Sequence, residues 1–235
     1  MTNNKALFSW SGGKDSAFAL GEILEKKEYE IAFLLTSMGQ TTRRVSMHGV
    51  RENLIIQQAD AIGLTLRFIE LPDNPDMETY ESVLFEAMNE AKKQSIAYSI
   101  FGDIFLEDLK IYREKQLQKL DFKAVFPLWK KDTHSLIQEF IDKGYRSIIT
   151  AVDAKKLSKD FAGQVIDKYL IRQLPKDVDP CGENGEFHSF VFDAPYFKNP
   201  IDFDKGEIVY KEYEVEDQNI SNGFWFCDLL PKIQE

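Results

Sequence analysis

Short apolar runs alternate with longer segments of helical periodicity over the first two thirds of the chain. Residues 29–36, YEIAFLLT, are largely apolar, as expected for a strand that is covered on both faces of its sheet. Residues 14–26 place Ala17, Leu20 and Ile23 on one side of a helix. This alternation of strand and helix patterns is typical of parallel β–α–β units.

The pattern repeats and predicts an order of elements. We expect strands at residues 6–10, 29–36, 65–71, 98–102, 124–127 and 146–152. We expect helices at residues 14–26, 51–62, 77–93, 107–120 and 133–143, with Gly63 and Gly144 following two of them. After about residue 155 the pattern changes to a short helix at 165–174, a strand at 187–193 and short β segments between 201 and 228. The change predicts a main α/β domain, residues 1–127, and a smaller mixed α+β domain, residues 128–235.

Charge and composition narrow the class of protein. The chain has 235 residues, with 29 Lys and Arg against 39 Asp and Glu, and a net charge of −10. A negative chain repels phosphate backbones, which argues against nucleic acid as the main partner unless a local basic face exists. The two cysteines, Cys181 and Cys227, are too few for a disulfide framework, so reduced thiols are the simpler interpretation, with one disulfide left open. With no membrane-length apolar window and no signal-peptide pattern, we expect a soluble cytoplasmic protein with no membrane contact.

The clearest chemical signal is the hexapeptide SGGKDS, residues 11–16, which follows the first predicted strand. Two glycines permit a tight turn, and the free N–H groups of the following helix favour an anion there. Lys14 adds a positive charge, whereas Asp15 would repel phosphate unless a Mg²⁺ ion bridged them. The segment therefore predicts a site for a nucleotide pyrophosphate with its metal. The alternative is a glycine-rich turn without a ligand, since the spacing is neither that of a P-loop nor GxGxxG.

Two further segments carry chemistry. Gly102 and Asp103 end the fourth predicted strand, which puts a carboxylate on the ligand-binding edge of the sheet; Glu107 and Asp108 fit equally well as a solvated helix N-terminus. Residues 179–190, DPCGENGEFHSF, gather carboxylates, a thiol and a histidine that could hold a metal or transfer protons. On a strand, the side chains of residues 186 and 188 would share one face. A polar hairpin turn is the alternative interpretation.

These segments together resemble a known family. SGGKDS is similar to the pyrophosphate loop, or PP-loop, of the N-type ATP pyrophosphatases. With Gly102-Asp103-Ile104, Pro127-Leu128-Trp129 and residues 181–195, CGENGEFHSFVFDAP, the chain resembles the diphthine–ammonia ligases over about residues 5–200. Ser189 stands where that family has Thr and Ala194 where it has Gly, and Met47-His48 is a looser match.

The resemblance implies a fold and an activity. The fold would be a doubly wound parallel sheet, HUP-like and similar to the adenine nucleotide α-hydrolases, with the nucleotide at the carboxyl ends of the strands. The activity would be that of an ATP-dependent, AMP-forming ligase. ATP would adenylate a carboxylate or carbonyl oxygen of a modified histidine on elongation factor 2, pyrophosphate would leave, and ammonia would displace AMP to give diphthamide.

The resemblance also implies roles for single residues. The nucleotide would be bound by Ser11, Gly12, Gly13, Lys14, Asp15, Ser16, His48, Gly102 and Asp103. Mg²⁺ would be held by Asp15 and Asp103. The catalytic residues that face the acceptor would be Glu183, Glu186 and His188, which would position ammonia or take its proton.

Three alternatives stay open at the level of sequence. A tRNA sulfur transferase would need paired cysteines or a basic RNA-binding module, and the sequence has neither. A non-catalytic ATP-binding module would bind nucleotide without releasing pyrophosphate. The same adenylation chemistry could serve a different carboxylate acceptor, as it must if the source is bacterial. The acidic segment after residue 201 fits a homodimer contact, a lid or a solvated edge.

Overall fold

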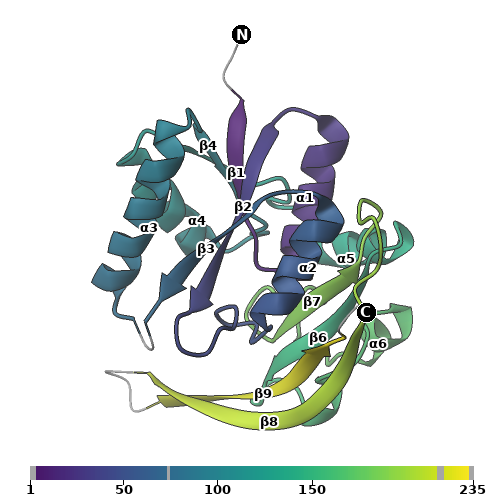
Figure 1. Ribbon diagram of the computed structural model, residues 1–235. Helices are drawn as coiled ribbons and strands as arrows, with labels where there is room; N and C mark the ends of the chain where they lie inside the picture. The colour runs from purple at the N-terminus through teal and green to yellow at the C-terminus, as the bar shows by residue number, and fades with distance from the viewer. Residues whose placement is uncertain (1–3, 73–74, 216–219, 233–235) are drawn as a thin grey trace.

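The structure is a computed structural model that describes residues 4–72, 75–215 and 220–232. It contains two sheets, one parallel and one antiparallel, with helices packed around and between them (Figure 1). The first sheet is built from the first half of the chain and the second sheet from the remainder.

The first sheet has the order β3-β2-β1-β4-β5, and each neighbouring pair is parallel. Its strands are β1 (Lys5–Ser9), β2 (Glu30–Gly39), β3 (Leu66–Leu71), β4 (Tyr98–Ile100) and β5 (Lys123–Val125). This is the strand order of a doubly wound sheet, so the predicted fold class is confirmed. The strand order reverses between β1 and β4, and loops at the carboxyl ends of these strands therefore border a crevice.

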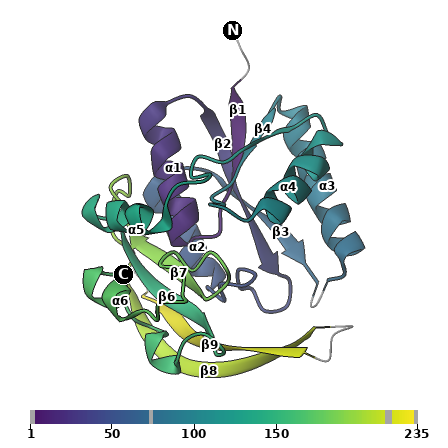
Figure 2. The same ribbon diagram turned by 180° about the vertical axis from the view of Figure 1, so that it is seen from behind.

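Helices cover both faces of the parallel sheet. On one face lie α1 (Lys14–Lys26) and α2 (Glu52–Ile62), and on the other lie α3 (Met77–Lys93) and α4 (Glu107–Gln118), as the two opposite views show (Figures 1 and 2). The bounds of α1 and α3 are those predicted. Gly63 ends α2 with φ of 82°, a left-handed conformation that glycine adopts without steric cost.

The second sheet has the order β7-β6-β9-β8 with antiparallel pairs. Its strands are β6 (Arg146–Asp153), β7 (Phe187–Asp193), β8 (Phe203–Val215) and β9 (Ile220–Pro231). The accompanying helices are α5 (Thr133–Asp142), the 3₁₀ turn η1 (Lys159–Phe161) and α6 (Lys168–Gln173). The C-terminal part is therefore the mixed α+β arrangement that was predicted.

Two predicted elements of this part are wrong in extent. The short helix starts at Lys168 rather than at residue 165, because Val165 bridges to Ile148 and the Asp167 side chain caps the helix. The short β segments after residue 201 are two long strands that pair with each other. The exposed and charged side chains of β8 hide the alternation that marks a buried strand, and the length of β9 follows from its pairing with β8.

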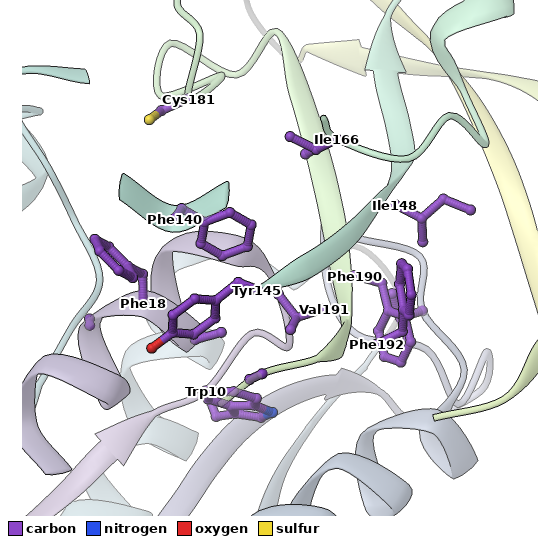
Figure 3. Packing of buried hydrophobic residues seen from close by; sticks show 14 of the residues in the cluster. Trp10, Phe18, Phe140, Tyr145, Ile148, Ile166, Cys181, Phe190, Val191 and Phe192 are labelled. Carbon is purple, nitrogen blue, oxygen red and sulfur yellow. The ribbon is translucent and has the colours of Figure 1, made fainter. Parts of the chain in front are cut away.

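Both sheets share one hydrophobic core. Phe18 of α1 packs against Phe140 of α5 and against Tyr145, with ring centroids 6.0 and 5.3 Å apart (Figure 3). Phe190 and Val191 of β7 belong to the same buried cluster. A second buried cluster, which includes Leu7, Phe33 and Met88, lies entirely before the predicted domain boundary after residue 127, whereas the shared cluster crosses that boundary. The boundary therefore stays a prediction. None of the helices in the described ranges is long and apolar enough to cross a membrane.

Candidate active site

A cavity of about 370 Å³ opens at the carboxyl edge of the parallel sheet, next to the crevice between β1 and β4. Its wall contains most of the predicted site residues, namely Ser11, Lys14, Asp15, Ser16, His48, Gly102, Asp103, Glu183 and His188. Segments that are more than 160 residues apart in the sequence, such as residues 11–16 and 182–189, thus meet in one site. The lining does not include three other predicted site residues, namely Gly12, Gly13 and Glu186.

The loop between β1 and α1 is fixed by hydrogen bonds from the second sheet. Gly12 has φ of 76°, which a side chain would disfavour, and its carbonyl accepts hydrogen bonds from Val191 N at 2.9 Å and Gln58 Nε2 at 3.0 Å. Lys14 N donates to Ser189 Oγ at 3.1 Å. Because α1 begins at Lys14, its N-terminus and the positive end of its dipole face the cavity.

Lys14 supplies a buried positive charge at this N-terminus. Its side chain is 4% exposed, and Nζ donates to both Asp15 carboxylate oxygens, at 2.6 and 2.7 Å. Burial alone would lower the pKa of Lys14, but the Asp15 carboxylate outweighs it and raises the pKa. The ammonium is therefore charged at neutral pH, which suits an anionic ligand.

Asp103 enters the cavity from the loop after β4. Its neighbour Gly102 packs directly on the first turn of α1, where a Cβ atom would lie 2.8 Å from Asp15 C and from Ser16 N. Asp103 Oδ2 lies 3.1 Å from Arg113 Nε. Burial raises the pKa of the Asp103 carboxyl although Arg113 opposes the shift, and the nearby Asp15 carboxylate raises it further.

Glu107 and Asp108 are not part of the cavity wall. Both side chains are exposed in the first turn of α4, where they complement the positive end of the helix dipole. The solvated interpretation of these two carboxylates therefore holds.

Glu183 connects the C-terminal motif to the Asp103 loop. Its Oε1 accepts a hydrogen bond from Ile104 N at 2.7 Å. Burial, together with the Asp15 carboxylate, raises the pKa of Glu183 to about 7. A carboxyl group that titrates near neutral pH in a cavity is suited to take or give a proton.

Two neutral histidines form another part of the wall. The rings of His48 and His188 lie 4.8 Å apart, and His48 Nδ1 lies 3.0 Å from Ser189 O, so that Nδ1 carries the proton and donates. Burial lowers the pKa of His48 to about 4 and that of His188 to about 3. Among the described residues, His188 Nε2 is buried without a hydrogen-bond partner. Both rings are uncharged at neutral pH, so they act through hydrogen bonds rather than through charge.

Glu186 does not face the cavity, which corrects the predicted placement beside His188. Glu186 precedes β7 and is 2% exposed, and its carboxylate accepts hydrogen bonds from Asp179 N at 3.0 Å and Asn184 N at 3.0 Å. These bonds close the loop of residues 179–186, which is the polar turn that the sequence left open. The carboxylate thus shapes the loop that carries Glu183.

Sequence reasoning missed Gln58. This side chain on α2 is fully buried, accepts a hydrogen bond from Trp10 Nε1 at 2.9 Å and donates to Val191 O at 2.6 Å, besides its bond to the Gly12 carbonyl. One signal could have found it. Gln58 occupies the apolar stripe with Leu54 and Ile55, where a polar residue needs buried partners.

The two cysteines lie in different places. Cys181 is buried and its Sγ lies 3.4 Å from Thr133 O, and burial raises the pKa of its thiol. Cys227 lies on β9 of the second sheet, and both cysteines are free. Neither thiol lines the cavity that the loop of residues 11–16 borders.

Comparison with known proteins gives two family matches. Residues 4–124, just over half of the chain, match the model of the diphthamide synthase N-terminal domain, and residues 132–220 match that of the diphthamide synthase C-terminal domain. The second match extends to residue 220, beyond the range over which the resemblance was recognised in the sequence.

Individual relatives carry a related name. The diphthine–ammonia ligase of Bos taurus is 31% identical over 132 residues, and that of Homo sapiens is 30% identical over 132 residues; both alignments cover 54% of this chain and 49% of the relative. The chain thus spans about half the length of the curated relatives that it matches. A solved structure, the U34-tRNA thiolase NcsA from Methanococcus maripaludis with its 4Fe-4S cluster, aligns with a TM-score of 0.35 at 15% identity, over 60% of this chain and 57% of that chain.

Proposed function

The chain belongs to the diphthamide synthase family, and on this basis we propose that it is an ATP-dependent, AMP-forming ligase that joins ammonia to an acceptor carboxylate. The proposed acceptor is diphthine, the modified histidine of elongation factor 2, and the proposed location is the cytoplasm, where that factor works. One observation carries the proposal. The loop of residues 11–16 and the motif of residues 181–189 line the same cavity, so a nucleotide and an acceptor can meet there.

The proposed nucleotide orientation follows from charge. The β and γ phosphates lie at the N-terminus of α1, where Lys14 adds a charge and the Ser11 and Ser16 hydroxyls add donors. Leu35, Phe101 and the aromatic ring of Tyr80 give the same cavity an apolar wall that suits the adenine base.

The residues present fit a magnesium ion. Among the described residues there is no group of three or more metal-ligating side chains, but Mg²⁺ is commonly bound through one or two carboxylates together with substrate phosphates and water. Asp15 and Asp103 line the same cavity, and Asp103 Oδ2, although it lies 3.1 Å from Arg113 Nε, is buried without a hydrogen-bond partner among the described residues. We propose that these two residues hold Mg²⁺, which when bound would neutralise the charge of the phosphates.

The proposed chemistry has two steps. In the first, a carboxylate oxygen of the acceptor attacks the α phosphorus, the bond to the bridging oxygen breaks, and pyrophosphate leaves. In the second, the ammonia nitrogen attacks the acyl carbon, AMP leaves with the carboxyl oxygen, and one proton of the nitrogen is lost. Glu183, with its pKa of about 7, is the proposed acceptor of that proton. The neutral His48 and His188 rings offer hydrogen bonds that orient the nitrogen nucleophile.

The test is to incubate the protein with ATP, ammonium and elongation factor 2 that carries diphthine. We expect AMP, pyrophosphate and the mass change of an acid becoming an amide. Asp15→Ala should abolish ATP–pyrophosphate exchange, since it removes a proposed magnesium ligand. Production of ADP in place of AMP would refute the proposal.

Glu183→Gln separates the two steps. Amide formation by the native protein should rise with pH as Glu183 deprotonates around its pKa of about 7, because only the carboxylate accepts a proton. The variant should keep ATP–pyrophosphate exchange and lose this rise in the pH–rate profile. An unchanged profile in Glu183→Gln would assign the proton transfer to another group.

The structure weakens one alternative function. A sulfur transferase needs reactive thiols at the nucleotide, whereas Cys181 is buried with a raised thiol pKa and Cys227 lies on β9. The non-catalytic ATP-binding module differs from the ligase in releasing no pyrophosphate, so the assay above also decides that case. A different carboxylate acceptor would give AMP with that acid and not with diphthine.

The domain division is part of the proposal. We place the boundary between residues 1–127 and 128–235, which is supported by the end of β5 at Val125 and the start of α5 at Thr133. The two family models leave residues 125–131 unmatched between them.

A further inference from the structure

A second, larger groove adjoins the cavity. Its volume is about 820 Å³, and it lies between the loop after β2 and the hairpin formed by β8 and β9. In both opposite views this hairpin curves beneath the carboxyl ends of β2 and β3 (Figures 1 and 2). The groove and the cavity share four lining residues, so the two spaces adjoin across a common wall: Val45, Ser46, Met47 and Tyr80.

The walls of the groove are apolar with charges of both signs. Met47 is 65% exposed and Tyr213 is 45% exposed, and Phe226 of β9 lies next to Gly49 of the loop. Lys211 and Glu207 add one charge of each sign. Exposed aromatic and methionine side chains among mixed charges are typical of surfaces that bind proteins, whereas a polyanion would require a basic surface.

An ion-pair cluster fixes the loop to the hairpin. Asp228 of β9 accepts from Arg44 Nη1 at 2.8 Å and from Arg51 Nη2 at 2.6 Å. Arg44 Nη1 also donates to Gly49 O at 2.7 Å. These bonds hold the segment that carries both Met47 and the cavity residue His48, so the shared wall is preformed rather than assembled around a ligand.

We propose that this groove receives the main chain of the acceptor protein, so that the acceptor carboxylate on its side chain passes Met47 and Tyr80 to reach the nucleotide. This inference rests on the proposed function. A cavity of about 370 Å³ has the size of a nucleotide site, and an acceptor that is part of a protein needs room for the residues that flank it. The adjoining groove supplies that room on the other side of the shared wall, which residues 45–47 and Tyr80 form.

Cross-linking tests the position. Tyr213 lines the groove, whereas Tyr210 is three residues away on β8, packs on Trp225 at 5.0 Å and is 48% exposed. Each tyrosine is replaced by the photoreactive p-benzoylphenylalanine, and the protein is irradiated with diphthine-bearing elongation factor 2 and ATP. We expect a cross-link to the factor from position 213 and little from position 210. Equal yields, or a cross-link from position 213 to a second copy of this chain, would overturn the groove assignment.

Kinetics provide the second measurement. Val209 lines the groove and is 38% exposed, and its neighbour Ile208 is 43% exposed and belongs to the opposite face of β8. Val209→Glu should raise KM for the acceptor protein roughly tenfold with unchanged ATP affinity, and Ile208→Glu should leave both nearly unchanged. Equal KM values in the two variants would refute the inference. If Val209→Glu does not fold, the cross-linking result decides.

The two proposals fail in different ways. If the native protein does not amidate elongation factor 2 at all, the proposed function and the groove assignment fall together. If the native protein amidates the factor but the paired variants behave alike, the ligase stands and only the groove assignment is refuted.

Discussion

Replacing Gln58 by Leu tests how α2 supports the loop of residues 11–16. The substitution keeps a similar volume and removes three buried hydrogen bonds, to Trp10 Nε1, Gly12 O and Val191 O. The Gly12 carbonyl keeps its bond from Val191 N, but the indole N–H is left without that partner.

The cost can be worked from these contacts. Three hydrogen bonds contribute about 1 kcal/mol each, and an unsatisfied buried N–H adds about 1–3 kcal/mol, so the loss in the free energy of unfolding is about 4–6 kcal/mol. For a chain of this size that corresponds to a melting temperature lower by roughly 10–20 °C. ATP binding should weaken as well, because Gly12 and the start of α1 lose a fixed support.

The assay is urea and thermal unfolding of the variant, with ATP affinity measured by calorimetry. Gln57→Leu is the matched control. Gln57 directly precedes Gln58 on α2, is half-buried and lines a separate pocket with Lys198 and Asn199. If the free energies of unfolding of the two variants agree within about 0.5 kcal/mol, the hydrogen bonds of Gln58 do not carry the assigned role.

Three further predictions follow from the site. Gly102→Ala should abolish ATP binding in calorimetry, since its Cβ would meet the backbone of α1 at 2.8 Å, whereas Gly144→Ala, with open space at its Cβ, should change stability alone. Glu186→Ala should unfold more easily in urea and lose both half-reactions, and intact ATP–pyrophosphate exchange in a stable variant would contradict the supporting role. Burial lowers the pKa of His48 to about 4 and that of His188 to about 3, from the ordinary 6.5. Between each lowered pKa and pH 6.5, the unfolded chain therefore binds more protons than the folded chain. The contribution of both histidines to stability is complete above about pH 6.5 and is lost as the pH falls toward 4. Thermal unfolding of His188→Asn should therefore show a smaller loss of stability on acidification than the native protein. An equal loss in the two proteins would assign the acid sensitivity to other groups.

The sequence was sufficient for the elements of the parallel sheet. A strand buried on both faces is an uninterrupted apolar run, and a helix on that sheet repeats with its own period, so β2, α1 and α3 could be predicted from local pattern. The full lengths of β8 and β9 could not be predicted, because the exposed, charged sequence of β8 resembles a loop. Their length depends on pairing with each other, which is a contact between distant residues.

The sequence likewise identified most of the side chains around the cavity, since SGGKDS and CGENGEFHS are distinctive sequence motifs. It could not separate Glu183 from Glu186, which are three residues apart in the same motif. Only the folded loop turns Glu183 toward Ile104 N and the cavity and Glu186 inward to Asp179 N.

Residue type and spacing thus determined which chemistry this chain carries, because a phosphate loop needs glycines and a helix N-terminus in consecutive positions. The tertiary structure decided which groups line the cavity and in which protonation state. Burial and distant charges set the pKa of Glu183 and of the two histidines, and β7 and α2 hold the nucleotide loop in place. Those quantities depend on neighbours far apart in the chain, which no local pattern contains.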